Sequence, residues 1–95
     1  MKEVSVLRIK DGFELKNIHG EYIVISKEKS ILMPHNSIIL TDTAVFLWNL
    51  LKNQDVTKAE MLNALIENFD ISTVLALGNI DVFVRTMREN GIIEE

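Results

Sequence analysis

The sequence predicts an α+β fold, in which a three-stranded antiparallel sheet is followed by three helices in a winged-helix-like β-β-β-α-α-α order. Three patterns support this prediction: two strand-like runs joined at a glycine, a third strand that passes directly into a helix start, and two later helix starts. The chain has 95 residues, enough for one hydrophobic core. We therefore expect a single domain over residues 1–95.

The first two predicted strands form a hairpin. Residues 13–18 alternate apolar and polar side chains, which is the period of a strand with one buried face. Residues 22–25 are aromatic or β-branched, a composition typical of strands. Asn17–Gly20 connects them, because Gly20 can adopt the positive φ that tight hairpin turns need. The third strand, Ser37–Leu40, is short and uncharged.

The segment Leu40–Leu51 predicts the first helix. Thr41 is placed to accept a backbone N–H at the N-cap, and Asp42 lies in the first turn, where the helix dipole favours negative charge. From Ala44 onward nearly every side chain is apolar, so most of this helix should be enclosed, with Trp48 in the core.

The second helix is predicted over residues 58–68. Thr57 and Glu60 have the spacing of a capping box, and Val56 and Met61 occupy the positions of a hydrophobic staple. The side chains expected to face the core are Met61, Leu62, Leu65, Ile66 and Phe69.

Ser72 is the expected N-cap of the third helix, which should end near Asn90 with Gly91 as a left-handed C-cap and Ile92 packing back. At about 100° per residue, the inner arc comprises Thr73, Ala76, Leu77, Ile80, Phe83, Val84 and Met87. The solvated flank comprises Val74, Asp81, Arg85 and Arg88.

A third strip of this helix faces away from the core and carries no charge. It consists of Leu75, Gly78, Asn79, Val82 and Thr86. A surface helix normally shows Lys or Glu on such a face. Three interpretations stay open at this point: incidental exposure of apolar residues, a dimer contact, or one wall of a peptide-binding groove.

The third strand suggests the same groove. Ser37, Ile38, Ile39 and Leu40 include no lysine, proline or bulge residue to protect a sheet edge. An uncharged edge strand beside an uncharged helix strip is the arrangement that strand addition by a peptide requires. The alternative is that the loop Ser26–Asn36 covers this edge.

The sequence offers no catalytic constellation. It has no cysteine, two histidines without partners at metal-ligand spacing, and four glycines that form no phosphate loop. We therefore expect no metal site, no cofactor and no enzymatic activity. No membrane span or signal-peptide pattern is present, so a cytoplasmic protein is expected.

Three segments of the chain resemble the PqqD-like family, a small domain also called the RiPP precursor peptide recognition element. Leu40–Leu51 matches the family's strand-to-helix pattern, which includes a Phe-Leu-Trp run. Asn79–Ile93 matches its third-helix ending, and Gly20–Val24 fits its second strand. The resemblance covers Gly12–Glu95, and most matching positions are core or cap residues.

This resemblance implies a peptide-binding function. Such domains bind the leader segment of a ribosomally made precursor peptide and present it to a modifying enzyme of natural product biosynthesis, often a radical SAM enzyme or a leader peptidase. The implied peptide-binding residues are Ser37, Ile38, Ile39, Leu40, Leu75, Asn79, Val82 and Thr86. The sequence departs from the family pattern at Thr41, usually asparagine, and at Asn79, usually an acid.

Two other functions fit the predicted fold: a winged-helix DNA-binding protein and a plain subunit-assembly module. A recognition helix needs several basic residues, but the third helix offers only Arg85 and Arg88, with Asp81 one turn before Arg85. Residues 31–95 hold four basic and nine acidic residues, whereas residues 1–30 hold six basic and five acidic ones. The acidic helical part therefore disfavours nucleic acid as a partner.

We predict no salt-sensitive binding to duplex DNA, because a net charge of −4 repels the phosphate backbone. Fluorescence anisotropy with labelled duplex at low salt measures this directly. Sub-micromolar affinity that falls steeply with added salt would contradict the prediction and favour the DNA-binding alternative.

Overall fold

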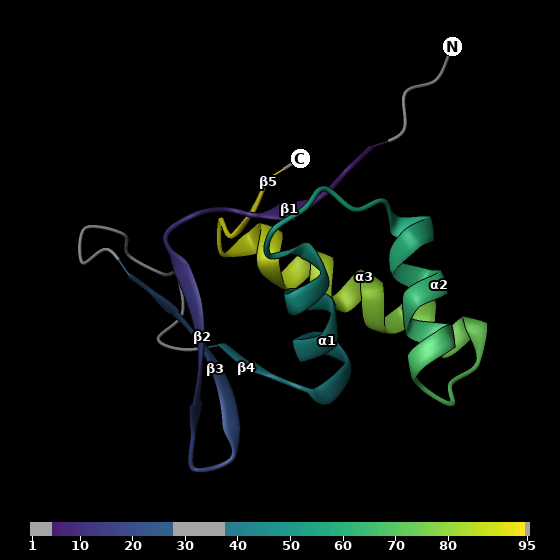
Figure 1. Ribbon diagram of the computed structural model, residues 1–95, viewed down its shortest axis with the longest axis horizontal. Helices are drawn as coiled ribbons and strands as arrows, with labels where there is room; N and C mark the ends of the chain where they lie inside the picture. The colour runs from purple at the N-terminus through teal and green to yellow at the C-terminus, as the bar shows by residue number, and fades with distance from the viewer. Residues whose placement is uncertain (1–4, 28–37, 95) are drawn as a thin grey trace.

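The computed structural model describes residues 5–27 and 38–94. Its elements are β1 (Arg8–Ile9), β2 (Phe13–Ile18), β3 (Glu21–Ser26), β4 (Ile38–Leu40), α1 (Asp42–Leu51), α2 (Lys58–Asn68), α3 (Thr73–Glu89) and β5 (Ile93–Glu94). Strands β2, β3 and β4 form an antiparallel sheet in that order, and three helices follow (Figure 1). The predicted α+β fold class is confirmed. The helices lie beside the sheet, with α2 farthest from it (Figure 1).

The β2–β3 hairpin turns at His19 and Gly20, which both have positive φ, 53° and 86°. Two consecutive left-handed residues match the right-handed twist of the flanking strands, so the hairpin closes without splaying. The Gly20 N–H donates to Asn17 Oδ1 at 3.0 Å, which holds the turn. The hairpin prediction is confirmed, and β3 begins one residue earlier than predicted, at Glu21.

A second, two-stranded sheet was not predicted. Strands β1 and β5 pair antiparallel, with Ile9 opposite Ile93, and they join the two ends of the domain. Leu7 and Val56 add an isolated bridge through two backbone hydrogen bonds of 2.8 and 2.9 Å. All four of these side chains are buried. Each strand has only two residues, too few for a periodic pattern to be read from the sequence.

The predicted helix starts are confirmed. Thr41, Thr57 and Ser72 each accept the backbone N–H three residues ahead, at 3.1–3.3 Å. The Thr57 backbone N–H in turn donates to the Glu60 carboxylate at 3.0 Å, which completes the capping box. This backbone hydrogen bond, with one from the Thr57 side chain, lowers the pKa of Glu60 because both favour the ionised carboxylate.

The predicted end of α3 is also confirmed. Gly91 has a φ of 68°, and its N–H donates to the Arg88 carbonyl at 3.1 Å. The Ile92 N–H donates to the Met87 carbonyl at 2.9 Å, and the Ile92 side chain is buried. These two bonds form a Schellman motif, which turns the chain back into β5.

One hydrophobic core joins the helices to the inner face of the sheet. Its largest fully buried side chains are Trp48, Leu47, Leu51, Met61, Leu65, Ile80, Met87, Ile92, Val24 and Val84. None of the helices in the described part of the chain combines the length and apolarity needed to span a membrane.

Three core predictions were wrong. Ile66 and Leu77 are 39% and 44% exposed, and Thr73 is exposed as well. The buried stripe on each helix is narrower than the predicted arc. Leu77 lies at the margin of the α3 arc and therefore outside the buried stripe. Thr73 is the first residue of α3, before the buried stripe begins at Ala76.

We predict that Trp48→Ala destabilises the domain by about 3–5 kcal/mol, because Trp48 is 1% exposed and its removal leaves a large cavity. A domain of this size has a stability of about 5–10 kcal/mol, so the variant should be close to unfolding. Thermal melting followed by circular dichroism measures the effect. Val74→Ala is the control, since Val74 is 79% exposed. Melting of Trp48→Ala within a few degrees of wild type would contradict the prediction.

Candidate functional site

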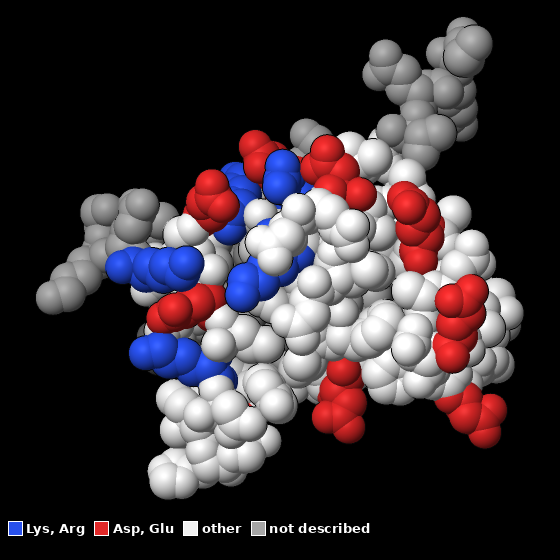
Figure 2. Space-filling model, viewed as in Figure 1, with Lys and Arg blue, Asp and Glu red and all other residues white. Residues whose placement is uncertain are grey.

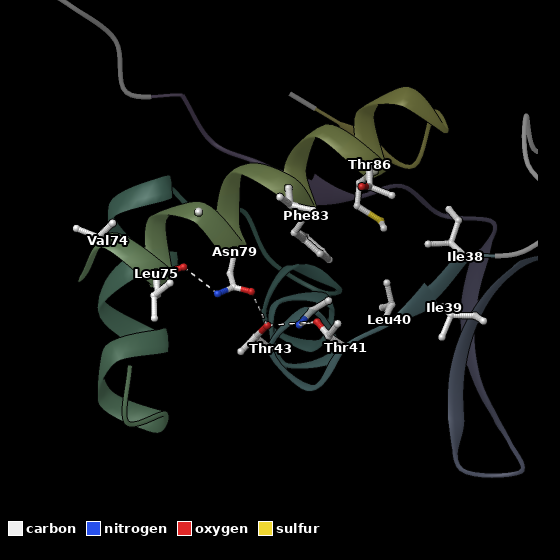
Figure 3. Close-up of a pocket in the computed structure, with 14 residues that line it drawn as sticks. Ile38, Ile39, Leu40, Thr41, Thr43, Val74, Leu75, Asn79, Phe83 and Thr86 are labelled. Atoms are coloured by element: carbon white, nitrogen blue, oxygen red, sulfur yellow. Dashed lines mark hydrogen bonds between the residues drawn. The ribbon is translucent and has the colours of Figure 1, made fainter. Parts of the chain in front are cut away.

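A groove of about 430 Å³ lies between β4 and α3, and the start of α1 closes one part of it (Figure 3). Its size falls within the range of known ligand sites. Its walls are mostly apolar, with four uncharged polar side chains and no charged one among the described residues. The lining residues are Ile38, Ile39, Leu40, Thr41, Thr43, Ala44, Val74, Leu75, Gly78, Asn79, Val82, Phe83, Thr86 and Met87.

Seven of the eight site residues predicted from the sequence line this groove. They are Ile38, Ile39, Leu40, Leu75, Asn79, Val82 and Thr86. Ser37 lies outside the described residues, as does most of the Ser26–Asn36 loop, the alternative cover for the edge. That these residues bind a peptide stays a prediction.

Sequence reasoning missed the contribution of α1 and the floor of the groove. Thr41 was explained as a cap, and Thr43 and Ala44 gave no signal of a role in a site. Phe83 and Met87 were assigned to the core, where they are almost wholly buried, yet they also line the groove.

The α3 wall exposes large apolar side chains. Leu75 and Val82 are 62% and 58% exposed, although both line the groove. Val74, predicted as part of a solvated flank, is exposed and also lines the groove beside Leu75 (Figure 3). Neighbouring exposed apolar groups beside a hollow are typical of an interaction surface.

The backbone of Ile39 faces the open side of β4, as the strand registers show. In an antiparallel ladder, hydrogen-bonded pairs alternate with pairs whose N–H and C=O groups point outward. The Lys27 N–H donates to the Gly12 carbonyl at 2.7 Å, so the odd-numbered residues of β3 direct their backbone groups toward β2. The even-numbered ones, Tyr22 and Val24, therefore direct theirs toward β4.

Tyr22 lies opposite Leu40, and Val24 lies opposite Ile38, so Leu40 and Ile38 use their backbone groups to pair with β3. Ile39 lies between them and directs its N–H and C=O away from β3. In the described part of the chain, no strand pairs with this side of β4. The open edge therefore offers one complete donor and acceptor pair, at Ile39.

A chain of hydrogen bonds joins the start of α1 to α3 across the groove (Figure 3). The Thr43 hydroxyl donates to Asn79 Oδ1 at 3.2 Å, and the hydroxyls of Thr41 and Thr43 are 3.3 Å apart. Asn79 Nδ2 donates to the Leu75 carbonyl at 2.8 Å. These bonds fix the Asn79 amide in the middle of the groove.

The charged side chains are unevenly distributed, as the sequence indicated: basic and acidic ones mix on the strand side (Figure 2). Figure 2 shows the visible Lys and Arg side chains gathered on the strand side and only acidic ones over α2. On α3, Asp81 is within ion-pair distance of Lys58 of α2, at 3.8 Å. Asp81 and Arg85 are exposed, and neither lines the groove.

A second hollow of about 250 Å³ is lined by Val6, Arg8, Asp55 and Glu94. Arg8 Nε lies 3.7 Å from Asp55 Oδ1, so the charged side chains that line this hollow form a surface ion pair with each other. In the described residues, no three His, Cys, Asp or Glu side chains come together as a group that could hold a metal.

The family model for coenzyme PQQ synthesis protein D (PqqD) matches residues 22–93 of this chain. The chain belongs to the PqqD family. The matched region runs from β3 to β5 and includes both walls of the groove. PqqD family proteins are non-catalytic accessory binding proteins associated with PQQ biosynthesis and with peptide and enzyme partners. No curated protein and no solved structure matches the chain.

We predict that proline is tolerated better at Ile39 than at Leu40. Proline removes a backbone N–H. Of these two residues, Leu40 directs its N–H toward β3, whereas Ile39 directs its N–H away from β3. A lost backbone hydrogen bond with a stranded partner costs about 1–3 kcal/mol. Alanine variants at both positions correct for side-chain loss, so the proline-minus-alanine difference in melting temperature reports the backbone alone. Equal differences at the two positions would show that the Ile39 N–H is bonded within the chain.

Proposed function

We propose that this protein is a non-catalytic binding module for the leader segment of a ribosomally made precursor peptide. The leader adds as an extra strand to β4 and is presented to a modifying enzyme. The observation that supports this most directly is the outward-facing backbone of Ile39 beside the exposed apolar wall of α3. Strand addition needs both features, one for main-chain hydrogen bonds and one for side-chain pockets.

In this arrangement the peptide residue opposite Ile39 forms two main-chain hydrogen bonds. Its own side chain lies on the outer face of the sheet, next to Ile39, which is 59% exposed. Because side chains alternate along a strand, the residues before and after it point inward, next to Ile38 and Leu40. There they meet the α3 wall.

The affinity comes mainly from apolar burial. Leu75 and Val82 are both more than half exposed in the free protein, and a leader strand would cover them. Burying a side chain of this size contributes about 1.5–3 kcal/mol, whereas one main-chain hydrogen bond contributes about 0.5–1.5 kcal/mol. The groove floor at Phe83 is already packed into the core, so little ordering of the protein opposes binding.

The partner enzyme supplies the chemistry, and we expect a radical SAM enzyme or a leader peptidase in the cytoplasm. By holding the leader, the module raises the effective concentration of the adjoining precursor at the enzyme. This role of presenting a peptide, as a peptide chaperone does, requires no cofactor in the module itself.

A subunit-assembly module is the second candidate, because the same exposed residues, Leu75 and Val82, would suit a contact with another protein chain. Light scattering distinguishes peptide binding from subunit assembly, since assembly without peptide appears as a concentration-dependent change in mass.

We predict that Val82→Lys weakens leader binding about ten- to hundredfold. Apolar contact is lost and a charge is placed in an uncharged groove, which together cost about 1–3 kcal/mol. Isothermal titration calorimetry with a candidate leader peptide measures the change, and light scattering of the protein alone reports self-assembly. Circular dichroism verifies folding, which should be retained because Val82 is 58% exposed.

Leu77→Lys is the matched control for this variant. Leu77 is also on α3 and 44% exposed, but it does not line the groove. The control should bind the leader like wild type. Unchanged affinity in folded Val82→Lys protein would remove α3 from the binding site.

A further inference from the structure

The hydrogen bonds around Asn79 have a fixed direction. The Thr41 oxygen accepts from the Ala44 N–H, and the Thr43 hydroxyl donates to Asn79 Oδ1. Each hydroxyl has one hydrogen to donate. The contact of 3.3 Å between the two threonines therefore has Thr41 as donor and Thr43 as acceptor. Asn79 Nδ2 uses one of its two hydrogens on the Leu75 carbonyl.

The bonding capacity that is left is mostly that of an acceptor. Thr41 Oγ1, Thr43 Oγ1 and Asn79 Oδ1 each keep one free acceptor site in the described structure. Asn79 Nδ2 keeps one free N–H. The three side chains of Thr41, Thr43 and Asn79, called here the polar notch, thus offer three acceptors and one donor.

The polar notch interrupts an otherwise apolar groove. In Figure 3 it lies between Val74 and Leu75 at one end and Leu40 and Ile38 at the other, next to Phe83. A peptide lying along β4 would cover it and exclude water. Acceptors that lose water without gaining a donor cost about 1–3 kcal/mol each, so a fully apolar peptide is penalised at this point.

The notch also discriminates by charge. A carboxylate has only acceptors, so it would face three others and could pair with only one donor, the free N–H of Asn79. An ammonium has donors, but no carboxylate lines the groove in the described residues, so its burial would lack a counter-charge. A neutral side chain that donates a hydrogen bond avoids both penalties.

We propose, resting on the proposed function, that the groove selects leader peptides carrying an uncharged hydrogen-bond donor side chain between apolar ones. The donor is Ser, Thr, Asn or Gln. It comes from the peptide residue that lies next to the one paired with Ile39, on the side toward Thr41, and it donates to the polar notch. Asn79 and Thr43 are thereby the residues that determine specificity.

A random 12-residue peptide library displayed on phage tests this with the full chain as target. Selections on wild type should enrich apolar–donor–apolar sequences. Selections on Asn79→Leu, a change to a side chain of similar size without polar atoms, should enrich the donor less strongly, because one of the three acceptors is removed. Thr43→Val is a second variant with the same expectation. Thr86→Val is the matched control: Thr86 lines the groove outside the notch, so the donor preference should persist.

A synthetic peptide from the wild-type selection then gives the affinity change. Replacing its donor, for example Thr with Val, should weaken binding to wild type about tenfold and weaken binding to Asn79→Leu clearly less. An equal loss on both proteins would overturn the assignment of the notch.

The outcomes separate this inference from the proposed function. In one outcome, Val82→Lys no longer binds the selected peptides, but wild type and Asn79→Leu enrich the same motif. This result would overturn the role of the notch in specificity and leave the groove as the binding site. Peptides that Val82→Lys still binds would overturn the groove itself. Failure of wild type to enrich any peptide would overturn both.

Discussion

The passage from β4 into α1 without an intervening loop is the constraint on which the rest of the site depends. Thr41 closes the strand and caps the helix in one residue, with its side chain accepting the Ala44 N–H and its carbonyl accepting the Val45 N–H. Two turns later Trp48 is buried at the centre of the core. Since the core fixes α1, it also fixes β4 beside α3, and the groove follows from that placement.

The exposed edge and the apolar wall would each be a liability alone. An unprotected edge strand invites pairing with other chains, and exposed Leu75 and Val82 invite association. Here β4 has three described residues, and among them one complete backbone pair is open, at Ile39. So short an edge pairs weakly unless side chains add contacts. The α3 wall supplies such contacts to a strand that fits the groove, which favours a specific partner over general aggregation.

Much of the fold could be predicted because the ends of its helices are determined by local sequence. The caps at Thr57 and Ser72 and the C-cap at Gly91 act within a few residues of the sequence that encodes them. The contact between Thr43 and Asn79 spans 36 positions and depends on how α1 meets α3, which no periodicity reveals. Strands β1 and β5 were missed for the same reason, since two residues carry no pattern until the fold brings them together.

The buried and exposed faces of α3 explain how one helix serves both the core and the groove. The core side of the helix is held in place by three almost fully buried side chains, Ile80, Phe83 and Met87. Val82, on the neighbouring face, is 58% exposed. Phe83 and Met87 also line the groove, so its floor cannot move without disturbing the core. The groove is therefore held in shape in the free protein, and under the proposed function the selection among peptides falls to the side chains on its walls, Asn79 among them.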